Sequence, residues 1–371
     1  MPAETQKTKL LAYDARLLFP TLLLVGIGVV MVYSASSELA LEKFGSEYHF
    51  FKKQAIFALL GILALVFYRH VPYRVHRLMA YPLLGIALAG LIAVQFSKWG
   101  VSAGGSSRWL RIGEITVQPS EFARFALIVY LAYSMDKKGE KLKDLYIGFL
   151  PHALVLGTLT AFIILQPDFG SVVILGAITW IMMFVAGARI RHLIISVLIL
   201  SPFLYLFMLT AQYRIKRWLS FLNPWQFSST EGYQIIHSMM AFGTGGLWGA
   251  GIGKGYQKLF YLPEPHTDFI FSVIGEELGL LGVIAILSLY VFIIWRGIII
   301  SRNARDVYGS FLAFGLTLAI GLQVCVNMGV ALGLLPTKGL ALPFLSYGGT
   351  SLLINMASIG ILMNIGAASF R

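Results

Sequence analysis

Long apolar stretches recur along this chain, and they restrict what it can fold into more than any other feature. Ten of them approach the length of about 20 mostly apolar residues that a helix needs to cross a bilayer. Only 12% of the residues are charged, against about 25% in an average soluble protein, which is too few to cover a surface that faces water. The sequence therefore excludes a soluble globular enzyme and a disordered chain, and it predicts an all-α polytopic membrane protein.

We expect about ten transmembrane helices in a single domain over residues 1–371. The fourth stretch is short, and the charged residues Glu121 and Arg124 lie at its start. The first follows a basic segment, and with nine more stretches behind it we expect it to remain as an uncleaved signal-anchor. The predicted spans are residues 17–35, 54–68, 79–96, 121–134, 147–165, 170–187, 192–211, 269–295, 309–333 and 349–369.

The distribution of basic residues sets the predicted orientation. An even number of spans puts both termini on one side, which we assign to the cytoplasm. The cytoplasmic segments then hold 16 of the 29 Lys and Arg residues, as the positive-inside rule requires. Five of the other 13 bases lie in one long outer loop, residues 212–268, between the seventh and eighth spans, and long loops count little in this rule. The net charge of +12 therefore indicates orientation rather than nucleic-acid binding.

The long outer loop is predicted to be folded. A loop of this length without a role is uncommon, and this one is rich in Trp and Tyr. Residues 233–242 have the apolar spacing of a helix, which we expect to lie along the outer membrane interface or dip into it. Residues 243–255 are rich in glycine, but they do not form a phosphate-binding loop because Lys254 is followed by Gly255 rather than Ser or Thr.

Polar residues inside or beside a membrane are costly and are functional candidates by default. Nearly all of those in this chain lie on the predicted outer side, in four segments dense in polar, Gly and Pro residues. The predicted cytoplasmic loops are short and basic and hold no comparable cluster. The four segments are residues 104–110 leading to 118–121, 166–170, 261–268, and 335–339 leading to 343–349.

Each acidic candidate also has a structural interpretation. Asp168 and Asp268 both precede an apolar run, where a carboxylate can cap the first N–H groups of a helix. Both interpretations stay open for Asp168, whereas function is favoured for Asp268. Glu276 and Glu277 lie about two turns into the eighth span, where adjacent carboxylates need cationic partners or protons. Arg124 is one such partner.

The remaining polar candidates are bases and amides. Arg108, Lys254 and Lys338 either meet lipid headgroups or bind an anion such as phosphate at the membrane surface. Lys338 is the better candidate because apolar residues flank its segment. Gln323 and Asn327, four residues apart in the ninth span, are interpreted as hydrogen-bonding residues between helices rather than as ligands.

Six motifs, in this order, resemble those of the SEDS family (shape, elongation, division and sporulation). The resemblance covers essentially the whole chain. The segment around Lys338 and the run that ends at Asp268 look more like the division branch than the elongation branch, and the sporulation branch is a near relative. The motifs are residues 118–121 (QPSE), 166–170 (QPDFG), 232–234 (GYQ), 257–271 (QKLFYLPEPHTDFIF), 275–279 (GEELG) and 335–339 (LPTKG) with 346–349 (SYGG).

The resemblance implies a peptidoglycan glycosyltransferase that polymerises lipid II, the undecaprenyl-diphosphate-linked disaccharide pentapeptide, on the outer face of the bacterial plasma membrane. The family's essential aspartate maps to Asp268, and its acidic residue at the start of the fourth span maps to Glu121. Arg124 stands where many members have Lys, which favours an electrostatic role over proton transfer. We expect catalytic roles for these three residues. The expected substrate contacts are Lys338, Arg108, His266, Thr267, Asp168, Glu276 and Ser346.

The expected mechanism makes Asp268 the general base on the 4-hydroxyl of the acceptor GlcNAc, while Arg124 and Lys338 stabilise the departing diphosphate. The resemblance also implies a class B penicillin-binding protein, a single-span transpeptidase, and other cell-division proteins as partners. It leaves open whether a divalent cation, Mg²⁺ or Mn²⁺, takes part, and it implies no other cofactor.

Two functions of other classes remain as alternatives. A lipid II flippase fits the number of spans, but it needs polar groups along a path to both faces, and here they cluster on one. A non-catalytic division scaffold would tolerate neutral substitutions at Asp268, Glu121 and Lys338.

Overall fold

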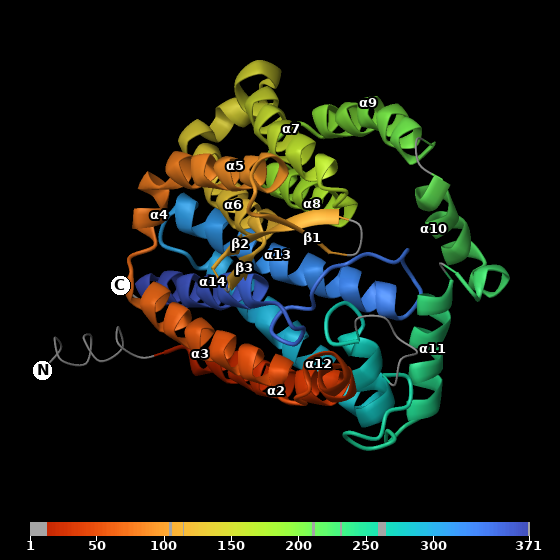
Figure 1. The fold of residues 1–371 in the computed structure, drawn as a ribbon. Helices are drawn as coiled ribbons and strands as arrows, with labels where there is room; N and C mark the ends of the chain where they lie inside the picture. The colour runs from red at the N-terminus through yellow and green to blue at the C-terminus, as the bar shows by residue number, and fades with distance from the viewer. Residues whose placement is uncertain are drawn as a thin grey trace, which may run out of the picture.

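The structure is a computed structural model in which residues 13–103, 106–113, 115–209, 212–230, 232–258 and 265–369 are described. Its long helices lie side by side as a bundle, and two shorter helices, α10 (Gln212–Leu222) and α11 (Tyr233–Gly245), lie across one end of it (Figure 1). The first and last helices meet at the opposite end. There the Arg69 guanidinium lies 5.7 Å from the Tyr13 ring, and the Arg69 carbonyl accepts a hydrogen bond from Asn364.

All ten predicted spans coincide with helices. Six helical segments are long and apolar enough to cross a membrane by length and composition, three more predicted spans are shorter apolar helices, and α6 with its buried charges is the remaining one. The prediction of a polytopic helical membrane protein is therefore confirmed. In chain order the helices are α2 (Ala15–Phe44), α3 (His49–His70), α5 (Ala80–Phe96), α6 (Pro119–Lys138), η2 (Leu145–Phe149) continuing into α7 (Leu150–Leu165), α8 (Phe169–Val185), α9 (Ile190–Leu209), α12 (Ile270–Arg302), α13 (Val307–Ala331) and α14 (Gly349–Ala368).

The segments predicted to be cytoplasmic lie together at one end of the bundle. They include the short helices α4 (Arg74–Leu78) and η1 (Gly139–Lys143). Three ion pairs connect residues of these segments that lie far apart in the sequence, so the predicted grouping on one face is observed. The pairs are Arg296–Asp14 at 2.8 Å, Arg77–Asp136 at 3.0 Å and Arg74–Asp306 at 3.1 Å.

The core lies where α14 packs against α3 and where α13 packs against α6 and α12. Close approach of backbones is possible because small residues stand at the contacts, as is typical of membrane helices. A Cβ on Gly360 of α14 would lie only 2.4 Å from the carbonyl oxygen of Leu65 on α3. A larger residue at this position would therefore force the two helices apart.

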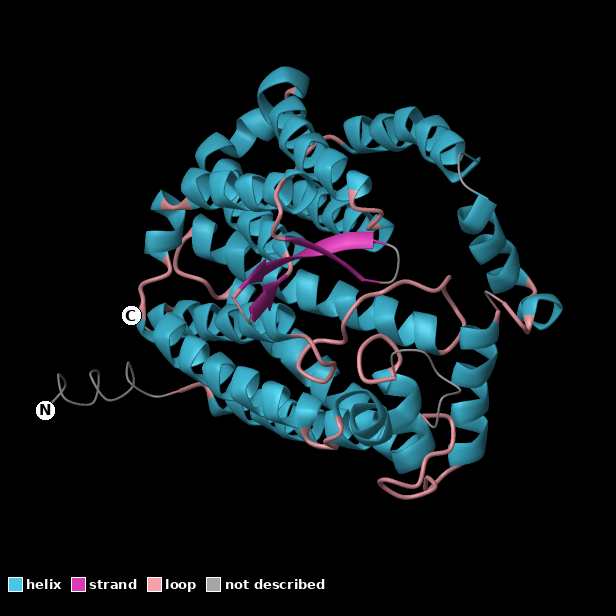
Figure 2. Cartoon of the chain, in the orientation of Figure 1, coloured by secondary structure: helices cyan, strands magenta, loops and turns pink. Residues whose placement is uncertain are grey.

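One small antiparallel sheet accompanies the otherwise all-α fold. It consists of β1 (Gly100–Ala103), β2 (Ser106–Ile112) and β3 (Ile115–Val117) in the order β1-β2-β3 (Figure 2). These residues precede α6 and contact α5 and α14. The strands have four, seven and three residues, and strands of this kind are stable only when they pair with one another and pack against helices. The sheet matters for function because β2 carries Arg108.

The described residues of the long outer loop, 212–230, 232–258 and 265–268, are folded, as predicted. It contains α10, the short 3₁₀-helix η3 (Pro224–Phe227) and α11. Helix α11 includes the predicted helix over residues 233–242, and it buries Ile235, Ile236 and Ala241 where it packs against α12. Its orientation across the end of the bundle fits the predicted place at the membrane interface (Figure 1).

Helix α12 is broken at Gly279, whose φ of +65° is not helical. A break inside an apolar helix frees backbone groups that need partners. The glycine-rich segment after α11 supplies them, which gives this segment a structural role. The four hydrogen bonds run from Leu280 N to Gly246 O (2.9 Å), Leu281 N to Leu247 O (3.3 Å), Ala250 N to Glu276 O (2.9 Å) and Gly251 N to Glu277 O (3.0 Å). We call residues 270–278 the half-helix.

Candidate functional site

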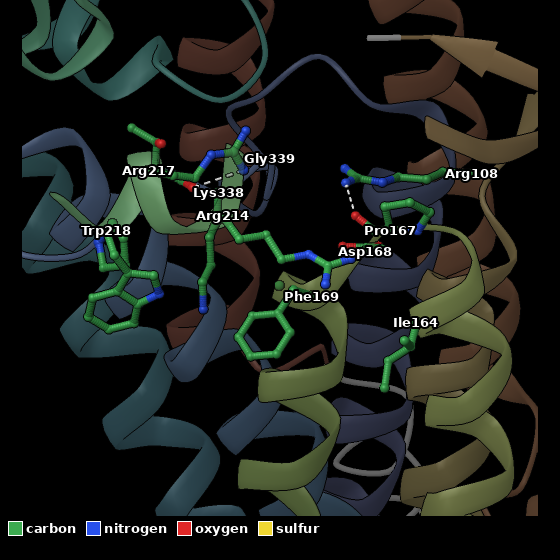
Figure 3. A pocket seen from close by; sticks show the side chains of 13 residues that line it. Arg108, Ile164, Pro167, Asp168, Phe169, Arg214, Arg217, Trp218, Lys338 and Gly339 are labelled. Atoms are coloured by element: carbon green, nitrogen blue, oxygen red, sulfur yellow. Dashed lines mark hydrogen bonds between the residues drawn. The ribbon is translucent and has the colours of Figure 1, made fainter. Parts of the chain in front are cut away.

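A basic cavity lies at the end of the bundle opposite the ion pairs of the predicted cytoplasmic segments. It encloses about 80 Å³ and brings together strand β2, the junction between α7 and α8, helix α10 and residues 336–339 (Figure 3). Its lining contains four basic side chains and one carboxylate, so it suits an anionic ligand. The charged residues are Arg108, Asp168, Arg214, Arg217 and Lys338.

Arg108 reaches the cavity from β2. Its Nη2 donates a hydrogen bond of 2.7 Å to the carbonyl oxygen of Pro167. Its Nε is buried and has no hydrogen-bond partner among the described residues. An arginine has five donors, and a buried donor without an acceptor is costly. The unsatisfied Nε is therefore consistent with an anionic ligand that completes the site.

Lys338 enters from the segment between α13 and α14. Its Nζ lies 5.3 Å from the centre of the Phe169 ring. Burial lowers the pKa of this ammonium group, and the nearby Asp168 carboxylate offsets part of that effect. A partly desolvated cation interacts more strongly with an anion than one in open water does. Lys338 thus lies in the lining of a basic cavity.

Asp168 has the structural role that remained open from the sequence. It is the N-cap residue of α8, its Oδ1 accepts from Ser171 N at 3.3 Å, and its Oδ2 accepts from the Ser171 hydroxyl at 2.6 Å. The side chain is nevertheless part of the cavity lining, and the Arg214 guanidinium points toward it (Figure 3). Asp168 therefore helps to orient the cations.

Asp268 lies beside this cavity. Its Oδ2 is 3.0 Å from the position that a Cβ on Gly339 would take, and Nη1 of Arg108 is 3.4 Å from the same point. The carboxylate and the guanidinium thus meet at the residue after Lys338. Helix α12 begins at Ile270 with Phe269 in the N-cap position, so Asp268 lies one residue outside the capping position.

The backbone around Asp268 is tied to the segment that carries Lys338. Nδ2 of Asn327 donates to the carbonyl oxygens of Asp268 (3.0 Å) and Leu340 (2.6 Å). The Ser346 hydroxyl donates to the carbonyl oxygen of Thr267 (2.6 Å). Asn327 therefore forms hydrogen bonds, as predicted, but to two loop carbonyls rather than to another helix. The bond from Ser346 likewise joins two loops, and neither Ser346 nor Thr267 lines the basic cavity.

Two other polar candidates are enclosed by protein. His266 is buried between Phe50, at 4.5 Å between ring centres, and Tyr347, at 5.5 Å. Burial and then Lys43 lower its pKa to about 4, so its ring is neutral at physiological pH. Gln323 is also fully buried and has no hydrogen-bond partner among the described residues, so the predicted role between helices is wrong for Gln323.

Glu121 and Arg124 bind one another in the first turn of α6. Arg124 donates from Nη1 to Oε1 at 3.1 Å and from Nη2 to Oε2 at 2.6 Å, and each residue is only 4% exposed. Neither residue lines the basic cavity. The pair is thus buried beneath the outer end of the bundle, with its two charges satisfying each other.

Glu277 has a cationic partner, as its depth in the eighth span led us to expect, but the partner is Lys258 rather than Arg124. Glu277 binds Lys258 at 2.7 Å, and Glu276 accepts from the backbone N of Tyr256 at 2.7 Å. Glu276 has no exposed surface and does not line the basic cavity. Lys258 is the partner because the long outer loop folds back over the half-helix. No local sequence pattern shows which of several bases lies next to Glu277.

Sequence reasoning missed three members of the cavity, all on α10. Arg217 and Trp218 lie three and four residues after Arg214, so all three residues share one face of this helix. That spacing was the available signal. These three residues line the cavity only because of where α10 packs, and the sequence does not show that position.

A divalent cation does not fit the basic cavity by itself. Among the described residues no three His, Cys, Asp or Glu side chains come together as a metal site. The cavity's one carboxylate, Asp168, already accepts hydrogen bonds on both oxygens. We therefore derive no step through a metal.

Comparison with known proteins gives one consistent result. Residues 15–370 match the family model described as "Cell cycle protein", which spans FtsW, RodA and SpoVE. The chain is 47% identical over 353 residues to the "Probable peptidoglycan glycosyltransferase FtsW" of Geobacter metallireducens, covering 95% of this chain and 94% of that protein. It is 43% identical over 363 residues to "Stage V sporulation protein E" of Bacillus subtilis, covering 98% and 99%.

Solved structures agree. The rod shape determining protein RodA of Thermus thermophilus superimposes with a TM-score of 0.72 at 26% identity, covering 97% of this chain and 99% of that one. A chain from a peptidoglycan synthase complex that coordinates polymerization and crosslinking superimposes with a TM-score of 0.80 at 28% identity, with the same coverage.

Proposed function

Because this chain belongs to the FtsW, RodA and SpoVE family of cell cycle proteins, we propose that it is a peptidoglycan glycosyltransferase that polymerises lipid II on the outer face of the bacterial plasma membrane. The observation that carries the proposal is the meeting of the Asp268 carboxylate with a basic cavity at Gly339. A base beside an anion-binding surface is what transfer of a sugar from a diphosphate carrier requires.

The proposed reaction is a displacement at the anomeric carbon of the donor. The acceptor GlcNAc 4-hydroxyl loses its proton to Asp268, and its oxygen forms a bond to that carbon. The bond from the carbon to the diphosphate oxygen breaks, and the undecaprenyl diphosphate leaves with the electron pair. Asp268 is thus the general base, worth about 10²–10⁴ in rate.

Charge on the leaving diphosphate needs compensation as that bond breaks. Arg108 and Lys338 are the two bases expected to contact substrate that line the basic cavity. We add Arg214 and Arg217 as further bases that compensate this charge. We give Arg124 a supporting role instead, because its two terminal nitrogens are both used on Glu121. The substrate's apolar tail accounts for a sugar-transfer site at the end of a membrane bundle.

A role in cell division, with a class B penicillin-binding protein and other division proteins as partners, is the finer part of this proposal. It is supported by 47% identity to an FtsW protein and by the similar fold of a chain from a peptidoglycan synthase complex. The partner would supply the transpeptidase that crosslinks the new strands.

The direct test is polymerisation of purified lipid II by the full chain in lipid vesicles, with and without its co-purified transpeptidase, in Mg²⁺, Mn²⁺ or chelator. We expect glycan strands, separated by length on a gel, in at least one arm. If no strands form but labelled lipid II moves between leaflets, the chain is a flippase. If neither occurs, it is a scaffold.

The lowered pKa of Lys338 predicts an alkaline limit on activity. Because burial lowers this pKa, Lys338 loses its charge at a pH below the usual lysine range. We expect kcat/KM for lipid II to fall as the pH rises through that value. In Lys338→Arg the charge persists because the pKa of arginine exceeds about 12, so the fall should disappear even if activity is lower throughout. An identical alkaline fall in both proteins would contradict the assignment.

A further inference from the structure

The half-helix that follows Asp268 needs its own support. Its first end is close to Asn327, which binds the Asp268 carbonyl oxygen. Its other end stops at Gly279, where helical backbone is interrupted. The membrane-crossing part of α12 therefore does not dictate the direction of the half-helix, and other contacts must do so.

Glu277, in the last turn of the half-helix, makes the most buried ionic contact of this region. Its Oε1 lies 2.7 Å from Lys258 Nζ, and both carboxylate oxygens lie 2.7 Å from the Ser34 hydroxyl. Lys258 Nζ also donates to Ser34 Oγ at 3.0 Å. The exposed fractions are 1% for Glu277, 8% for Lys258 and 4% for Ser34. Helix α2, the long outer loop and the half-helix thus meet through one carboxylate.

The neighbouring carboxylate strengthens the same connection. Oε1 of Glu276 accepts from the backbone N of Tyr256 at 2.7 Å and of Gln257 at 3.2 Å. A Cβ on Gly255 would stand 2.9 Å from Glu276 Oε2, so the loop backbone lies directly against the half-helix. The outer loop is therefore held to the half-helix by charge and by backbone hydrogen bonds together.

We propose that Ser34, Lys258 and Glu277 form an anchor that sets the position of Asp268 against the basic cavity; this inference rests on the proposed glycosyltransfer. A buried ion pair is a weak source of stability because both charges lose their hydration. Its directional bonds, however, define one geometry. Glu277 lies nine positions after Asp268, and the intervening helix and N-terminal turn span about 13 Å and move as one rigid unit. A shift at the anchor is thus transmitted to the carboxylate.

These three residues are positioning residues, because none of them lines the basic cavity. The test compares the full-length wild type with Lys258→Met, Glu277→Leu and the double variant. Each single variant leaves one buried charge without its partner and should lower the melting temperature. The double variant should recover much of that loss, since Ser34 can turn its hydroxyl to a carbonyl of its own helix. Its kcat should nevertheless stay about 10- to 100-fold low with KM unchanged, because a displacement of about 1 Å costs that much.

A second readout does not depend on activity. Backbone hydrogen exchange over residues 265–278 should be faster in the double variant than in the wild type. The conservative Lys258→Arg should preserve both exchange and kcat. Arg296→Met with Asp14→Asn is the matched control, since it removes an ion pair from the cytoplasmic end of the same helix and should change neither quantity.

The outcomes separate the two proposals. If the double variant polymerises lipid II at the wild-type kcat, or its exchange is unchanged, the anchor does not position Asp268. If the wild type itself makes no polymer, the proposed function fails, while the exchange measurement still decides whether the anchor holds the half-helix.

Discussion

Asp268→Asn is expected to reduce lipid II polymerisation by about 10²–10⁴-fold, the range for loss of a general base. Asparagine has nearly the same shape but cannot take the proton of the acceptor hydroxyl. The fold should survive, because Asp268 lies one residue outside the N-cap position of α12 and Asn327 binds its backbone carbonyl rather than its side chain. The measurement is the initial rate of strand formation, together with the melting temperature of the purified protein.

Asp306→Asn is the control for this variant. Asp306 is the N-cap residue of α13 at the cytoplasmic end, and asparagine caps a helix about as well as aspartate. It should polymerise lipid II at close to the wild-type rate. Normal polymerisation by Asp268→Asn would show that this carboxylate is not the base and would return the site to a structural interpretation.

Arg124→Met is expected to lower the free energy of unfolding by about 3–5 kcal/mol, because it leaves the buried Glu121 carboxylate without its partner. Membrane proteins often unfold irreversibly, so the practical measure is the melting temperature at one scan rate. Arg124→Met combined with Glu121→Gln should recover most of the loss, since no unpaired charge then remains. Arg124→Lys, the residue common in the family at this position, should cost less because it keeps the charge but loses one of two hydrogen bonds.

The pair Lys143–Glu140 provides the matched control for this experiment. It has the same spacing of three residues, but its side chains are 53% and 87% exposed. Water and salt screen such a pair, so Lys143→Met should leave the melting temperature nearly unchanged. If Arg124→Met is as harmless as this control, the buried pair does not support the fold.

Some of the site was predictable because it depends on residue chemistry alone. A carboxylate such as Asp268 at the start of a span is expensive there, and so is Lys338 among apolar residues. That cost singles out both residues in the sequence. In the structure the Asp268 carboxylate and the Arg108 guanidinium meet at Gly339, the residue after Lys338. The pairing of Glu121 with Arg124 was also predictable, because residues three apart share one face of a helix.

Other parts depended on how distant segments dock. The sequence contains several bases that could pair with Glu277. Glu277 binds Lys258 rather than Arg124 because the outer loop folds back over the half-helix. Arg214 and Arg217 lie in that loop too, and only the placement of α10 brings them to the cavity. The strands around Arg108 are too short to be stable without each other.

The sequence by itself determined the spans, since a bilayer allows an apolar stretch to satisfy its backbone only within its own helix. This is why every predicted span coincides with a helix, whereas the positive-inside rule accounts for the basic segments lying on one face. The tertiary structure alone decided which charges surround Asp268 and what holds the half-helix beside it. Those choices are contacts between different segments, some as far apart in the sequence as Ser34 and Glu277, and they form only when the helices have already packed.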